Sequence, residues 1–152
     1  MIQDFKDELI KEFIHLSVML DNAEMELLEL RQTHRSLLAL IRISTFAQEY
    51  MLEMEEIIHM GPDKRMFYPS ELHTAVVKKY VSLDGISDFE ETMEAFPRPF
   101  SREFAHDKFD ELINESSSTL HNVELEIINA QHTVNFTLRE YNKAKVYLEG
   151  CH

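Results

Sequence analysis

The chain has 152 residues, of which 44% are hydrophobic and 28% are charged, a composition typical of globular or coiled-coil proteins and not of disordered ones. Its net charge of −13 argues against direct binding to nucleic acids or anionic membranes, because such binding depends on Lys and Arg. Three glycines and four prolines are few for this length, and they favour long helices over a many-turned β fold. We therefore expect a single helical domain over residues 1–152.

The cysteine content and the hydropathy pattern indicate the cellular location of the protein. The single cysteine, Cys151, excludes an internal disulfide and fits a reducing compartment. No stretch reaches the roughly 18–20 apolar residues of a membrane span. The N-terminal stretch carries charges throughout, unlike a secretory signal. A cytoplasmic protein is expected, with no membrane among its partners.

The first predicted element is one long helix over residues 2–59. When heptad position a is placed at Ile2, the a positions up to Ile58 are apolar except Ser44. Position d is mixed, and apolar residues at position e widen the seam toward a bundle face. The Asp21-Asn22 pair is the one place where a kink or break is expected. Gly61 and Pro62 are typical helix-stop residues.

The segment 60–100 is predicted to form a compact tip with two short helices. Ser70, after Pro69, is the expected N-cap of the first, which runs to about Leu83. The stretch 87–90 reads Ser-Asp-Phe-Glu, a capping-box pattern that opens the second. Two prolines at 97 and 99 end it.

A second long helix is predicted over 101–149, with Ser101 as its N-cap. Its a positions carry large apolar residues, and its d positions carry mostly small ones, which permit close approach of a partner helix. The d positions are Ser116, Val123, Ala130, Thr137 and Ala144. Two long helices joined by a compact segment are expected to pack antiparallel, with paired residue numbers that sum to about 164. The fold class is therefore an all-α, coiled-coil-like helical hairpin.

The first long helix has more apolar residues than one partner helix can cover. Such surplus apolar surface usually marks an interface. We assign it to self-association as a homodimeric helical bundle. The alternatives are that a different protein covers it, or that the tip folds back and covers part of it. The residues expected on the self-association face are Ile14, Val18, Met25, Leu28, Leu38 and Phe46.

The tip is nearly neutral between two acidic arms, and it combines basic and aromatic residues. This combination is enriched at protein interaction hot spots. A partner-binding role is therefore predicted for the tip, although the aromatic residues could equally form its own small core. The residues expected to bind the partner are Lys64, Arg65, Phe67, Tyr68, Lys78, Lys79, Tyr80, Arg98 and Phe100.

One set of residues has the chemistry of a metal site. Glu12 and His15 lie one turn apart, and the antiparallel arrangement places Cys151 and His152 near them, which together make a zinc-like ligand set. The simpler interpretation is two solvated side chains beside a chain end. No other pattern indicates a cofactor, and none indicates a catalytic nucleophile or a phosphate-binding loop.

The sequence thus favours a non-enzymatic protein that acts through protein–protein interaction, as an adaptor, an inhibitor or an assembly factor. Two alternatives are a metal-binding helical bundle and an acidic mimic of nucleic acid that blocks a basic groove on its partner.

Overall fold

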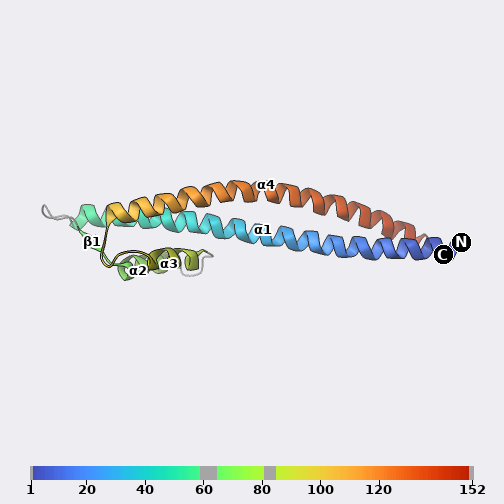
Figure 1. Ribbon diagram of the computed structural model, residues 1–152, viewed down its shortest axis with the longest axis horizontal. Coiled ribbons are helices and arrows are strands. Elements are labelled where there is room, and N and C mark those ends of the chain that lie inside the picture. The colour runs from blue at the N-terminus through green and yellow to red at the C-terminus, as the bar shows by residue number, and fades with distance from the viewer. Residues whose placement is uncertain (1, 59–64, 81–84, 151–152) are drawn as a thin grey trace. The chain divides into compact units, whose positions relative to one another are not determined.

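A computed structural model describes residues 2–58, 65–80 and 85–150. The elements are α1 (Ile2–Ile58), β1 (Met66–Phe67), α2 (Pro69–Lys79), α3 (Ile86–Glu94), β2 (Phe100–Ser101) and α4 (Arg102–Glu149). Helices α1 and α4 pack along each other, which confirms the predicted all-α helical hairpin (Figure 1). The break expected at Asp21-Asn22 is wrong, because α1 is one uninterrupted helix from Ile2 to Ile58.

The hairpin divides into two compact units. We call the first the terminal unit; it contains α1 as far as Gln32 and α4 from Val123 onward. We call the second the central unit; it covers residues 33–122 and therefore includes α2, α3 and both strands.

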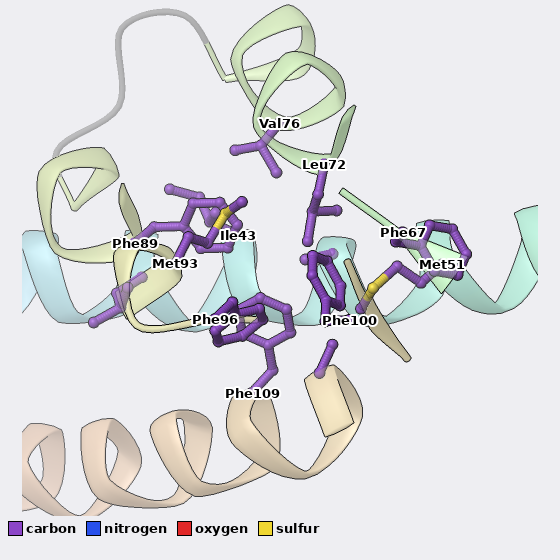
Figure 2. Packing of buried hydrophobic residues seen from close by; sticks show 13 residues of the cluster. Ile43, Met51, Phe67, Leu72, Val76, Phe89, Met93, Phe96, Phe100 and Phe109 are labelled. Carbon is purple, nitrogen blue, oxygen red and sulfur yellow. The ribbon is translucent and has the colours of Figure 1, made fainter. Parts of the chain in front are cut away.

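The central unit has a core to which all four helices contribute (Figure 2). Ile43 of α1, Leu72 of α2, Phe89 of α3 and Phe109 of α4 are all fully buried. The rings of Phe89 and Phe109 stack with their centroids 5.4 Å apart. Aromatic pairs of this kind stabilise a core by more than the burial of their surface area alone, so this pair should add to the stability of the central unit.

The tip folds onto α1 within the central unit, as the alternative in the sequence analysis expected. The ring of Tyr80, just after α2, meets the ring of Phe46 in α1 edge-on at 5.5 Å. The Nζ atom of Lys79 lies 4.5 Å from the centroid of the same Phe46 ring. Part of the surplus apolar surface in this half of α1 is therefore covered by the chain's own middle segment, whereas Leu52 is 45% exposed.

The short elements begin close to their predicted positions. Pro69 is the first residue of α2, where its fixed φ suits a helix start, so the cap falls at Tyr68 and not at Ser70. Helix α3 begins after Gly85, two residues before the predicted Ser87 cap. The Ser101 cap is confirmed, because its Oγ accepts a hydrogen bond from the Phe104 N–H at 3.2 Å. Leu83, the predicted end of the first short helix, lies outside the described residues.

A two-stranded ribbon joins the tip to α4 and was not predicted. Met66 pairs with Ser101 and Phe67 pairs with Phe100, in antiparallel order. The rings of Phe67 and Phe100 lie 6.2 Å apart and are both buried. Strands of two residues show no alternation of apolar and polar residues, which explains why the sequence pattern does not indicate them.

The terminal unit contains only the two long helices and has a thin core. Leu20, Ala23 and Leu27 of α1 are buried against Ala130 and Val134 of α4. Near the chain ends, the rings of Phe13 and Tyr141 stack at 4.8 Å. At the end of this unit's part of α1, the Arg31 guanidinium donates to the Gln131 side-chain oxygen at 2.9 Å.

The seam of α1 uses different heptad positions in the two units. Buried residues of α1 in the terminal unit occupy positions a and e, as in Ala23 and Leu27, whereas those in the central unit include positions d and g, as in Ala47 and Ile43. On α4 the five predicted d positions are all buried, which confirms that seam. Arg31 and Gln131 lie opposite each other, as the predicted pairing of residue numbers between α1 and α4 requires. Phe13 departs from that pairing, because it stacks on Tyr141 and not on a residue nearer the C-terminus.

Candidate protein interaction surface

Eight of the described large apolar side chains of α1 are exposed in the terminal unit, and four of these, from Ile14 to Leu28, follow one another along one side of the helix. Ile14, Val18, Met25 and Leu28 are each between 53% and 56% exposed. Residues of an α-helix are about 100° apart around its axis. Val18 and Met25 therefore point away from the side of α1 on which Leu20 is buried against α4. We call these four residues, together with Asp21 between them, the back face.

The back face has the spacing of a coiled-coil seam. The intervals from Ile14 to Val18, Asp21, Met25 and Leu28 alternate between four and three residues, which is the pattern that accepts the side chains of a facing helix. In the terminal unit, α1 thus has two seams on opposite sides, and among the described residues only the one facing α4 is covered. A second helix is the complement that this pattern fits.

Asp21 is the one charged residue within this second seam. Its side chain is exposed and has no hydrogen-bond or ion-pair partner among the described residues. Glu24 and Glu29 lie on the two flanks of the seam. Lys11 forms an ion pair with Glu8, in which the Nζ and Oε1 atoms are 3.9 Å apart. Residues 1–32 and 123–152 together carry 12 acidic and 6 basic residues. The surface around the back face is therefore acidic.

Exposed apolar residues on α4 do not form a comparable series. Five of the six lie within about 100° of one another around the helix, but gaps of eight and ten residues interrupt them, so they do not form a continuous seam. The exposed large apolar residues of α4 in the terminal unit are Leu125, Ile128, Phe136, Leu138, Val146 and Tyr147. Scattered exposed apolar residues are normal on protein surfaces, so the back face is the candidate interaction surface.

The structure divides the predicted self-association face between the two units. Its first four residues are those of the back face. Leu38 and Phe46 lie in the central unit and are half-buried, and Phe46 is covered by Lys79 and Tyr80. The sequence pattern combined these six residues because heptads do not show which other segment packs on a helix.

Three of the residues predicted to bind a partner through the tip hold the tip together instead. Phe67 and Phe100 are 0% and 1% exposed and belong to the core. Arg65 forms an ion pair with Glu71, and its guanidinium lies 4.5 Å from the centroid of the Phe67 ring. Lys64 lies outside the described residues. The two aromatic residues are buried, but in a core that the tip shares with α1 and α4 and not in a small core of the tip's own.

The remaining predicted tip residues line three hollows in the central unit, two of which share Phe46 and Lys79. Tyr68 and Arg98 line one of about 430 Å³, in which the Nε2 atom of His73 lies 3.2 Å from the Oε1 atom of Glu90. Lys78 and Lys79 line another, of about 600 Å³. Tyr80 lines a third, of about 230 Å³, which also includes Lys79. The structure therefore does not gather the predicted tip residues into one surface.

The predicted metal set is only partly within the described chain. Glu12 and His15 are both exposed on α1, whereas Cys151 and His152 lie outside the described residues. Within residues 2–58, 65–80 and 85–150, no group of three or more His, Cys, Asp or Glu side chains could hold a metal ion. The four-residue zinc set stays a prediction.

Comparison with known proteins leaves the interaction surface to be interpreted from its own geometry. No protein-family model matches the sequence, and no curated protein or solved structure is significantly similar to it. In the part of the chain that the structure describes, no helix is long and apolar enough to cross a membrane.

Asp21 is the residue of the candidate surface that sequence reasoning did not single out. The sequence pattern indicates this residue only as part of a possible break in α1. A usable signal was present, because Asp21 lies at the centre of an alternating four-and-three series of apolar residues. The series marks a second seam because α4 packs on the other side of α1.

Proposed function

We propose that this chain is a non-enzymatic protein–protein interaction protein and that the back face of α1 is its interaction surface. The observation that supports this is the second coiled-coil seam, in which four large apolar side chains remain more than half exposed. Contiguous apolar surface at helical spacing is how an amphipathic helix binds its partner. The cytoplasmic location stays a prediction from the single cysteine.

Two kinds of occupant fit an apolar helix face. One is a second copy of this chain, as in the predicted homodimer, and the other is a helix of a different protein. Light scattering after size exclusion distinguishes them. A mass near twice 17.9 kDa supports the homodimer, and a mass near 17.9 kDa leaves the back face free for a different protein.

The interaction role is tested by capture experiments with paired variants. In V18E/M25E, two charges replace apolar side chains of the back face; because both residues are exposed, the fold should persist. The matched control is L125E/I128E on α4, where exposure is 50% and 54%. We expect proteins captured by the wild type, or its self-association, to be lost with the first variant and retained with the second. Equal binding by all three proteins would refute the proposal.

A further inference from the structure

The position of Asp21 restricts what can cover the back face. Asp21 is its midpoint, seven residues from both Ile14 and Leu28. If two copies pack antiparallel over the whole face, Ile14 meets Leu28 of the second copy, and Asp21 meets Asp21 of the second copy. If they pack parallel and in register, each residue meets its own counterpart. Both arrangements therefore place two Asp21 carboxylates against each other.

A pair of carboxylates within an apolar seam opposes association. Packing the seam removes both groups from water, and two like charges at close range repel each other. A register shifted by seven residues avoids the repulsion but places Asp21 against Ile14 or Leu28. This buries a carboxylate without a partner and shortens the contact. A second copy is thus a poor complement for this face.

A cation at the same point makes a good complement. We propose that the occupant of the back face is an amphipathic helix of a different protein that places a Lys or Arg opposite Asp21. A single polar residue within a coiled-coil seam is a known determinant of partner choice. Glu24 and Glu29 on the flanks make the surroundings of Asp21 more negative, which favours a basic helix further. This inference rests on the proposed interaction role of the back face.

The first test uses the protein alone. Sedimentation equilibrium of the wild type should give a mass near 17.9 kDa. The variant D21L removes the carboxylate and completes the apolar seam, so it should form a dimer. Adding M25E to D21L should return the monomer, which shows that the dimer uses the back face.

The second test supplies the opposite charge on the same scaffold. The variant D21K should remain a monomer alone, because it would bring two lysines together. An equimolar mixture of wild type and D21K should form a one-to-one heterodimer, bound at least about tenfold more tightly than either protein binds itself. M25E in both proteins serves as the control and should abolish the heterodimer.

The outcomes separate this inference from the proposed function. A wild-type dimer that M25E dissociates would overturn the inference, although the back face would still be an interaction surface. A D21L dimer without a wild-type and D21K heterodimer would overturn the requirement for a cation and leave the proposed function standing. If D21L and the mixture both stay monomeric and capture does not depend on Val18 and Met25, both proposals fail.

Discussion

Gly85, immediately before α3, packs directly against the backbone of Ser36 in α1. A Cβ atom at position 85 would lie 2.9 Å from the Ser36 carbonyl oxygen and 3.1 Å from the Leu40 amide nitrogen. Gly85 also has a φ of +89°, which side chains other than glycine rarely adopt. The start of α3 therefore approaches α1 as closely as it does because this residue has no side chain.

We expect Gly85→Ala to lower the free energy of unfolding by about 1–3 kcal/mol, because both the backbone angle and the contact with Ser36 become unfavourable. Urea denaturation followed by circular dichroism measures the change. Gly150→Ala is the matched control, since a Cβ there would meet its nearest atoms at 3.6 and 3.7 Å. A loss at Gly150 equal to that at Gly85 would contradict the interpretation.

The long helices could be predicted from the sequence, whereas the packing of the tip could not. The heptad pattern from Ile2 onward and the Ser101 cap are local signals, and both are present in the structure. Coverage of Phe46 by Lys79 and Tyr80 joins segments more than thirty residues apart. Periodicity identifies the apolar sides of a helix, but it does not identify the segment that packs on each side.

The stacked rings of Phe89 and Phe109 should be a major source of stability in the central unit. Both side chains are fully buried, and deletion of a buried aromatic side chain typically destabilises a protein by about 3–5 kcal/mol. Phe89→Ala should therefore unfold the central unit at much lower urea concentration, and Phe89→Leu should have a smaller effect. Phe136→Ala is the control at 61% exposure and should change stability by less than about 0.5 kcal/mol.

Loss of the Ser101 cap should destabilise the start of α4. Its Oγ accepts the Phe104 N–H, which would otherwise lack a helical partner. We expect Ser101→Ala to lower the free energy of unfolding by about 1 kcal/mol. Ser118→Ala, at an exposed position inside α4, should have a neutral or slightly stabilising effect because alanine favours helix. An unchanged stability of Ser101→Ala would show that the hydroxyl does not cap the helix.

The sequence pattern also could not show which of the surplus apolar residues of α1 stay exposed. The four apolar residues of the back face were predicted to be surplus, and they are exposed. Leu38 and Phe46 have similar hydrophobicity but are half-buried, because only the central unit has a tip that folds onto α1. Whether an apolar side chain is exposed therefore depends on which other segments pack on it, so the same residue type can belong to the core or to the surface.

The thin core of the terminal unit predicts that this unit opens locally. Tyr141 stacks on Phe13 at 4.8 Å and packs beside the small core around Ala130. Tyr141→Ala should weaken the terminal unit by about 1–3 kcal/mol. Because each 1.4 kcal/mol is a factor of ten, amide hydrogen exchange there should accelerate roughly 5- to 150-fold. Amides near Ile43 and Phe89 in the central unit should exchange at unchanged rates.

The matched control for this prediction is Tyr147→Ala. Tyr147 is 66% exposed on the same helix, so its removal should leave the exchange rates of both units nearly unchanged. If Tyr141→Ala accelerates exchange equally in the terminal and central units, the two units open as one cooperative structure. The local result would instead mean that α1 and α4 can separate in the terminal unit while the core around Phe89 stays folded, since so few side chains are buried between them in that unit.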